Sequence, residues 1–344
     1  MEFEAAFLIA QNERLLIDKI EYKDTLSVGQ VLVELYVSGI CGTQLGEIDG
    51  TKGKDNFIPH LMGHEGCGRV IKIGPGVTTV KEGDKVILHW KKGLGINSEV
   101  PKYSWKDRKI NAGWVTTFNK FAVVSENRMT SISEDVPNEK AALFGCAVTT
   151  GFGVVENNAK LKMGESIVVL GAGGIGLNII QAASLVSAYP IIAVDLYDER
   201  LELAKKLGAT HIINSRKSDF YSQVEDITNA SLDVFVDNTG LKDIIEKGYE
   251  LINNKGRLIL VGVPKIGQNI NIFSLPLHFG KTITGSFGGE CQPDKDIPRY
   301  LKLMMQNKFN LDNIITERYK LKDINLAIER MRSGKTVGRV VIDF

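Results

Sequence analysis

The stretch that decides the fold is Ser166-Ile-Val-Val-Leu170, then Gly171-Ala-Gly-Gly-Ile-Gly176, then the helical pattern LNIIQAASL at 177–185. By itself Gly-x-Gly-x-x-Gly is a weak signal, because a tight structural turn has the same letters. Here a β-branched run precedes the glycines and a helical pattern follows them, which is the context that a dinucleotide-binding loop requires. The stretch therefore predicts a strand, a phosphate-binding turn and a helix.

The three motif glycines have different expected tasks. Gly171 allows the tight turn, Gly173 lets the backbone approach a pyrophosphate, and Gly176 lets the helix pack closely on the strand. The helix N-terminus then offers free N–H groups and a positive dipole end to phosphate.

Asp195 ends the next apolar run, 191–195, and predicts which dinucleotide binds. A carboxylate at this place accepts hydrogen bonds from the adenosine 2′-hydroxyl and repels a 2′-phosphate. No arginine follows it directly, since the first one is Arg200. The sequence therefore predicts NAD(H) in preference to NADP.

The alternation of strand and helix continues on the C-terminal side of this turn. Short apolar strands are expected at 191–195, 211–214, 232–237 and 256–262, with longer helical patterns such as 199–209 and 243–254 between them. Alternating β and α elements of this kind predict a parallel, doubly wound sheet.

The residues before about position 150 have another texture. Short alternating or β-branched runs, separated by turn formers, predict a compact β-rich domain with strands at 31–37, 68–74, 84–90 and 121–124. After residue 285 the helical patterns 294–306 and 322–333 precede a last strand, 337–344. A lone strand must pair with something, so this tail is expected to return to the β-rich domain.

Composition excludes several classes of protein. A chain of 344 residues suggests two domains, and its 42 basic and 41 acidic side chains leave no global field for nucleic acid or an anionic membrane. No run reaches the roughly 18 apolar residues of a spanning helix, and the acidic N-terminus does not resemble a signal peptide. The four cysteines have no disulfide-framework spacing, so reduced thiols and a cytoplasmic location are predicted.

Three separated fragments carry possible metal ligands: Cys41, His64 and Cys146. Each alone is unremarkable, because a lone buried cysteine is usually a small hydrophobe. Together, two thiolates and one imidazole form the three-ligand set of a catalytic zinc, with a fourth position for water or substrate. Glu65, beside a ligand, is expected to steer or transiently occupy that position.

At this point the chain resembles the medium-chain zinc-dependent alcohol dehydrogenases, in the branch of the class I and glutathione-dependent class III enzymes. The resemblance covers nearly the whole length, in family order: ICGT (40–43), LMGHEGCGRV (61–70), GCAVTTGFG (145–153), VLGAGGIGLNII (169–180), IIAVD (191–195), KKLGATHIIN (205–214), GSFGG (285–289) and RSGKTVGRVV (332–341). It implies α/β architecture with a GroES-like β-rich catalytic domain at 1–148 and 286–344 and a Rossmann domain at 149–285. It also implies an active site in the cleft between them and a homodimer or homotetramer assembled through the Rossmann domains.

The resemblance also implies roles by position. Cys41, His64 and Cys146 become ligands of one catalytic Zn²⁺, and Thr43 bonds the alcohol as the first proton-relay group. The residues implied to contact the cofactor are Thr150, Gly171, Gly173, Gly174, Ile175, Gly176, Asp195, Arg200, Val261, Ser286, Phe287 and Arg339. Trp90 and Trp114 are implied to wall the alcohol pocket.

Three departures from the family pattern stand out. The segment 91–113 has none of the four cysteines of a second, structural zinc, which predicts one zinc per chain. For its lysine-rich part, 91–109, a solvated loop is the preferred interpretation over an anion-binding lobe. Gln44 replaces the usual carboxylate behind the zinc-ligand histidine, and its amide is expected to accept the imidazole N–H. The relay histidine of class I enzymes falls at Gly46, and His89 is considered as a substitute base or, in preference, a hydrogen-bonded strand end.

The sequence thus predicts a zinc- and NAD-dependent dehydrogenase acting on a CH–OH group. Its substrate is expected to be a secondary alcohol, polyol, cyclitol or sugar derivative, because two small residues (Ala112, Gly113) beside two indoles suggest a broad slot, and indole N–H groups bond hydroxyls. The alternatives are an NADH-linked reductase of small aldehydes or ketones, and a non-catalytic cofactor-binding relative. No nucleic-acid or membrane partner is expected.

Overall fold

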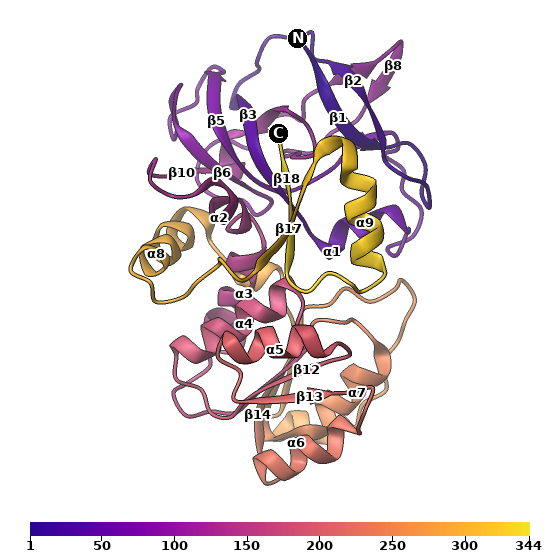
Figure 1. Ribbon diagram of the computed structural model, residues 1–344, viewed down its shortest axis with the longest axis vertical. Coiled ribbons are helices and arrows are strands. Elements are labelled where there is room, and N and C mark those ends of the chain that lie inside the picture. The colour runs from indigo at the N-terminus through magenta and orange to yellow at the C-terminus, as the bar shows by residue number, and fades with distance from the viewer. The chain divides into compact units, whose positions relative to one another are not determined.

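The computed structural model describes all 344 residues, and the chain divides into two compact units (Figure 1). Unit 1 comprises Met1–Cys146 together with Gln292–Phe344, and unit 2 comprises Ala147–Cys291. The sequence predicts the corresponding junctions after residues 148 and 285. No helix of the protein is long and apolar enough to cross a lipid bilayer.

Unit 1 is built on two antiparallel-rich sheets. The five-stranded sheet has the order β4-β1-β2-β7-β8, and the seven-stranded sheet has the order β10-β6-β5-β3-β18-β17, with β9 also paired to β3. The strands are β1 (Glu2–Leu8), β2 (Leu16–Glu21), β3 (Gln30–Ile40), β4 (His60–Leu61), β5 (Glu65–Ile73), β6 (Lys85–His89), β7 (Tyr103–Trp105), β8 (Arg108–Ile110), β9 (Phe121–Ser125), β10 (Met129–Ser131), β17 (Ile315–Lys320) and β18 (Arg339–Asp343). The predicted strands of the β-rich domain are confirmed.

The C-terminal tail completes unit 1. Helices α8 (Pro293–Met305) and α9 (Ile324–Arg332) precede β18, which pairs antiparallel with β3 through Val340 and Ile40. The prediction that the last strand returns to the β-rich domain is therefore confirmed. Because Cys41 directly follows β3, the C-terminal strand braces the strand that leads into this side chain.

The cysteine-free segment 91–113 is partly structured. β7 and β8 form a hairpin that joins the five-stranded sheet through β2, and Tyr103 is buried there. Before the hairpin, Ile96 donates its backbone N–H to the Glu126 carboxylate, which also accepts those of Thr78 and Thr79. A solvated loop describes only part of this segment.

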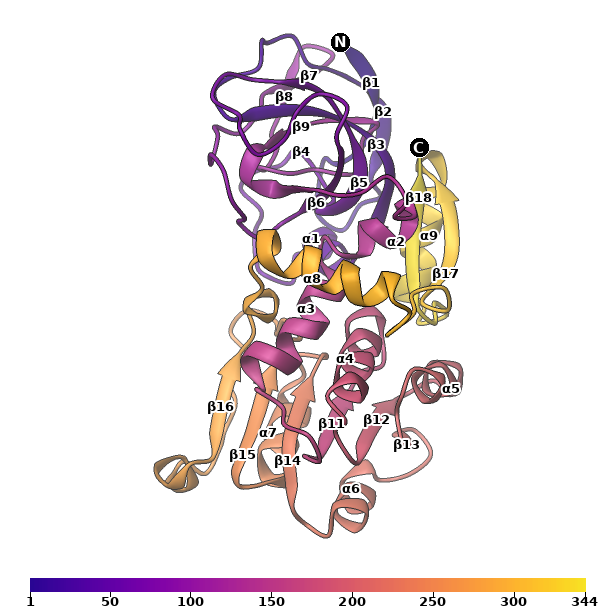
Figure 2. The same ribbon diagram turned by 90° about the vertical axis from the view of Figure 1, so that its left-hand side faces the viewer.

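Unit 2 is a single six-stranded sheet with the order β13-β12-β11-β14-β15-β16, and all its pairs are parallel (Figure 2). Numbered along the chain from β11, the strands lie in the sheet in the order 3-2-1-4-5-6, which is that of a doubly wound dinucleotide-binding sheet. The strands are β11 (Ile167–Leu170), β12 (Ile191–Asp195), β13 (His211–Asn214), β14 (Leu232–Asp237), β15 (Ile252–Leu260) and β16 (Thr282–Gly285), and the main helices are α3 (Ala147–Gly153), α4 (Gly174–Leu185), α5 (Asp198–Lys206), α6 (Phe220–Thr228) and α7 (Lys242–Leu251). The predicted fold class is confirmed.

The end of α7 differs from its prediction. The helical pattern at 243–254 predicts a helix that runs three residues further than α7, which ends at Leu251. Ile252 is buried and pairs with Leu232, so it already belongs to β15. Burial against the neighbouring strand therefore outweighs the helical propensity of the residues that follow.

Candidate active site

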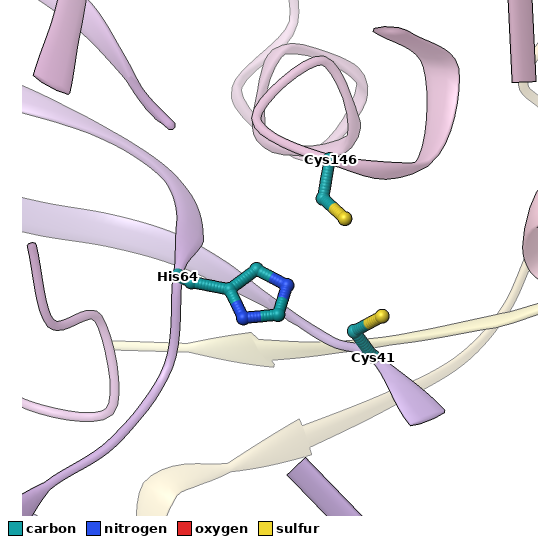
Figure 3. A group of neighbouring side chains, drawn as sticks. All are labelled: Cys41, His64 and Cys146. Carbon is teal, nitrogen blue, oxygen red and sulfur yellow. The ribbon is translucent and has the colours of Figure 1, made fainter. Parts of the chain in front are cut away.

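The three predicted metal ligands converge from separate parts of unit 1 (Figure 3). Cys41 follows β3 and caps the short helix α1 (Gly42–Ile48), His64 lies in the turn before β5, and Cys146 follows helix α2 (Asn138–Leu143). One ligand atom from each lies within 4.8 Å of the others, and the structure contains no other such group of three or more histidine, cysteine or acidic residues. We call these three residues the metal-ligand cluster.

The turn that presents His64 depends on Gly63. Its φ of +88° is a left-handed conformation, and a Cβ at this position would overlap the Oγ1 of Thr117. Met62, one residue earlier, accepts backbone N–H groups from Thr117 and Phe118. The backbone that leads into the histidine is therefore fixed.

The cluster has the donors that zinc requires. His64 Nε2 is buried and has no hydrogen-bond partner, although its other ring nitrogen has one. The Cys146 side chain, and after it His64, hold the pKa of the Cys41 thiol well below its ordinary value despite burial. Two sulfurs and one unpartnered imidazole nitrogen fit the protein ligands of a catalytic zinc, which leaves a fourth position open.

Gln44 supports the cluster in a way that differs from the expectation. Its Oε1 accepts the backbone N–H of Cys41 at 2.8 Å, as part of the capping box of α1, and its Nε2 lies 2.6 Å from His64 Nδ1. The amide nitrogen, a donor, therefore faces the imidazole, whereas the sequence predicts an accepting oxygen. The helix cap is the reason, because it takes the only acceptor atom of the amide.

Glu65 is neutralised by Arg339. The two side chains form an ion pair, and both are buried. Arg339, which resemblance assigns to the cofactor pyrophosphate, thus contacts the residue that follows a metal ligand, within unit 1.

His89 behaves as a hydrogen-bonded strand end, the preferred of its two interpretations. It is buried, with Nδ1 2.8 Å from the Lys91 carbonyl and Nε2 3.0 Å from Thr130 Oγ1. Burial lowers the pKa of His89 to about 4. At neutral pH this imidazole is uncharged and already bonded on both sides.

The predicted cofactor residues of unit 2 gather at one edge of its sheet. Because the six strands are parallel, their carboxyl ends lie at the same edge, where doubly wound sheets bind ligands. Gly171 follows β11, Asp195 ends β12, and Val261 follows β15. Beyond β16 come Ser286 and Phe287, and Thr150 and Ile175 lie on α3 and α4.

The glycine loop, Gly171–Gly176, fits a bound pyrophosphate. A Cβ added to Gly173 would meet nothing within 4 Å, so the backbone is open to a ligand there. A Cβ on Gly176, in contrast, would overlap the carbonyl oxygen of Gly171. The loop is thus tight where α4 packs and open where phosphate is expected.

Asp195 fastens the glycine loop. Its Oδ2 accepts the N–H of Ala172, and its Oδ1 accepts those of Leu196 and Tyr197. A carboxylate has about four lone-pair sites, so these three bonds leave about one for a ribose hydroxyl. Arg200 lies 3.8 Å from Oδ2.

Trp90 and Trp114, the two predicted walls of the alcohol pocket, differ in their surroundings. Trp90 directly follows β6 and is partly exposed. The residue before it, His89, pairs with Glu65 of β5. Trp114 is 42% exposed, but its indole N–H donates to the Ser98 carbonyl, so only its ring is open to a ligand. The expectation that this N–H bonds a substrate hydroxyl is wrong.

Glu47 is a residue of this region that the sequence reasoning missed. It lies on α1, four residues after Thr43, whose Oγ1 is 3.7 Å from Cys41 Sγ. The signal was available, since residues four apart in a helix lie on one face.

Family models match both parts of the chain. Residues 27–134 match the alcohol dehydrogenase GroES-like domain, and residues 174–306 match the zinc-binding dehydrogenase model. The first match lies in unit 1, and the second lies mainly in unit 2.

Whole proteins of the same kind are similar over nearly the full length. S-(hydroxymethyl)glutathione dehydrogenase of Paracoccus denitrificans is 31% identical, over 91% of this chain and 92% of its own. The benzyl alcohol dehydrogenase of Acinetobacter calcoaceticus is 30% identical, with a TM-score of 0.90 over 100% of this chain and 99% of its own. An alcohol dehydrogenase zinc-binding domain protein of Burkholderia ambifaria has a TM-score of 0.91 at 27% identity, over 100% and 99%. The predicted family is confirmed.

Proposed function

The chain belongs to the zinc-dependent alcohol dehydrogenase family, and we propose that it transfers a hydride between NAD and a bulky hydroxylated alcohol. The observation that carries this proposal is the metal-ligand cluster with its unpartnered His64 Nε2. A non-catalytic relative would not need two thiols and an imidazole that converge on one point.

The chemistry divides between the cofactors and the chain. When bound, zinc supplies a Lewis acid that lowers the pKa of the alcohol, and the nicotinamide accepts the hydride. Cys41, His64 and Cys146 would hold one zinc per chain. Thr43, whose Oγ1 lies 3.7 Å from Cys41 Sγ, would accept a hydrogen bond from the substrate hydroxyl and take its proton.

Cofactor binding is assigned to the open edge of the sheet in unit 2. Gly173 and the N-terminus of α4 would receive the pyrophosphate, and Asp195 the adenosine ribose. The remaining contacts, by resemblance, are Thr150, Gly174, Ile175, Arg200, Val261, Ser286, Phe287 and Arg339.

The substrate is proposed to carry a ring or an extended row of hydroxyls: a polyol, cyclitol, sugar derivative or other secondary alcohol. Ala112 and Gly113 beside the exposed ring of Trp114, together with Trp90, favour a broad slot with a flat wall. An indole face suits the apolar face of such a ring.

An aromatic primary alcohol is the second candidate. It is favoured by the likeness to the benzyl alcohol dehydrogenase and by the Trp114 N–H, which is already bonded to Ser98. Because that N–H is not available to a substrate hydroxyl, the slot has one hydrogen-bond donor fewer with which to select a polyol over an aromatic ring.

Comparison of kcat/KM for NAD⁺ reduction with ethanol, benzyl alcohol, linear polyols and cyclitols tests the proposal. The polyols or cyclitols are expected to exceed ethanol, and Trp90→Ala to lower their kcat/KM more than that of ethanol. A preference for ethanol above tenfold rejects the broad slot. A preference for benzyl alcohol establishes the second candidate.

Assembly through unit 2 is part of the proposal, as a homodimer or homotetramer. β16 ends its sheet with one unpaired edge, and the adjoining residues Leu275 and Phe279 are 52% and 69% exposed. Exposed apolar side chains beside an open edge are typical of an interface. Light scattering is expected to give a multiple of 37.9 kDa, and Phe279→Glu to reduce it. The four free cysteines support a cytoplasmic location.

A further inference from the structure

Glu47 and Thr43 occupy neighbouring positions on one face of α1. Residues four apart in a helix have Cβ atoms about 5–6 Å from each other. Thr43 Oγ1 lies 3.7 Å from Cys41 Sγ, so this face begins at the metal-ligand cluster. The carboxylate of Glu47 is therefore within reach of the Thr43 hydroxyl, directly or through one water molecule.

The Glu47 carboxylate is not engaged elsewhere in the protein. It forms no hydrogen bond and no ion pair, although it is only partly exposed. Burial raises the pKa of Glu47, while the nearby His64, His60 and Lys52 lower it and Cys41 raises it further. A carboxylate with a raised pKa and free acceptor atoms is suited to take a proton as a general base.

The other titratable groups near the metal-ligand cluster are already committed. Glu65 is paired with Arg339, and His60 lies 2.8 Å from Asp55 Oδ2. His89 is bonded on both ring nitrogens, and burial lowers its pKa to about 4. The Glu47 carboxylate has no such partner.

We propose that Glu47 takes the proton which the alcohol releases through Thr43, and passes it to solvent. This inference rests on the proposed function. The alcohol O–H gives its proton to Thr43 Oγ1 as the threonine hydroxyl proton moves to the Glu47 carboxylate. Glu47 then loses that proton to water, and the hydride leaves the same alcohol for NAD⁺, so the products are a carbonyl compound, NADH and one proton.

The pH dependence of this step has a definite sign. Glu47 accepts a proton only in its ionised form, which is present above its raised pKa. Proton release should therefore slow as the pH falls through that value. We call this decrease of the release rate at low pH the acid limb. Without Glu47 the acid limb should disappear, because no carboxylate remains to be protonated.

Proton release can be measured without turnover. The zinc-loaded protein with NAD⁺ is mixed with 2,2,2-trifluoroethanol, an alcohol too electron-poor to donate a hydride, in weak buffer with a pH indicator. Glu47→Gln keeps the size of the side chain and removes the base. Release is expected to slow about a hundredfold, the lower end of what a positioned base contributes. Added imidazole or acetate should restore it.

The matched control is Asp49→Asn, which removes a second carboxylate at the end of the same helix. Asp49 is exposed and pairs with Arg332, away from Thr43. Its release rate and acid limb should remain those of the unaltered protein. Zinc content is measured in every variant.

Three results overturn the inference. Glu47→Gln with an unchanged release rate and acid limb removes Glu47 from the path. A variant that loses zinc, or whose slow release no added base accelerates, assigns Glu47 a structural role. If the unaltered protein reduces no NAD⁺ with any alcohol, the proposed function has failed instead, which the turnover screen reveals separately.

Discussion

The glycine loop of unit 2 and the metal-ligand cluster of unit 1 are built in opposite ways. The glycine loop is six consecutive residues whose shape follows from local sterics, with Gly176 against Gly171. The metal-ligand cluster joins residues 41, 64 and 146, and its geometry exists only when β3 and β5 are paired. Binding of the two cofactors should therefore be separable by substitution.

Removal of a zinc ligand should have the largest effect. His64→Ala or Cys146→Ala is expected to lower kcat by about a thousandfold or more, because the Lewis acid contributes several kcal/mol to the transition state. NADH binding, followed by its fluorescence, should persist. Cys67→Ser, which alters a buried cysteine outside the metal-ligand cluster, is the control and should keep its zinc. Loss of NADH binding together with zinc would contradict the separation.

Asp195→Ala tests the other region. Loss of one charged hydrogen bond is worth roughly 1.5–3 kcal/mol, so the Kd for NAD should rise about tenfold to a hundredfold while zinc content stays the same. Discrimination against NADP should relax as the carboxylate is removed. Asp198→Ala, a nearby exposed acid paired with Lys217, should change neither quantity. An unchanged NAD/NADP preference in Asp195→Ala would remove this residue from the cofactor site.

Gln44→Glu sharpens the comparison within unit 1. A glutamate offers two acceptors, one for the Cys41 N–H and one for a proton on His64 Nδ1, which leaves Nε2 free for zinc. Zinc affinity, measured by competition with a chromophoric chelator, should rise about tenfold, the lower end of effects from residues behind a ligand. Gln44→Met also loses the acceptor of the Cys41 N–H and with it the cap of α1, so it should bind zinc more weakly than the unaltered protein. Equal affinity in all three proteins would reject this role.

The smallest effect is expected at Trp105. Its indole donates to Asp18 at 2.7 Å and its ring packs on Phe7, so it belongs to the five-stranded sheet. Trp105→Phe should lower the free energy of unfolding by about 1 kcal/mol in urea titration and leave kcat/KM unchanged. A changed substrate preference would mean that the hairpin of β7 and β8 reaches the alcohol.

The sequence predicted most of what is local in this protein. Strand, turn and helix around the glycine loop, and the return of the last strand to β3, follow from patterning and the need to pair edges. The ligand residues were also predictable, since their residue types define the metal. What was not predictable is how side chains share hydrogen bonds.

Gln44 and Trp114 illustrate that limit. Whether Gln44 accepts from or donates to His64 depends on the helix cap, which already uses the amide oxygen. Whether the Trp114 N–H is available depends on Ser98, sixteen residues away in a segment of irregular backbone. The helical spacing already places Glu47 beside Thr43, but only the structure shows that the neighbouring titratable groups are paired elsewhere.

The most direct test of a single zinc site formed by Cys41, His64 and Cys146 is a titration of metal-free protein with zinc, followed by alcohol-dependent NADH formation. Activity should rise linearly and stop at one zinc per chain, with NADH binding already complete before the first addition. Full activity in the metal-free protein, or a rise that continues to two zinc ions per chain, would contradict the account.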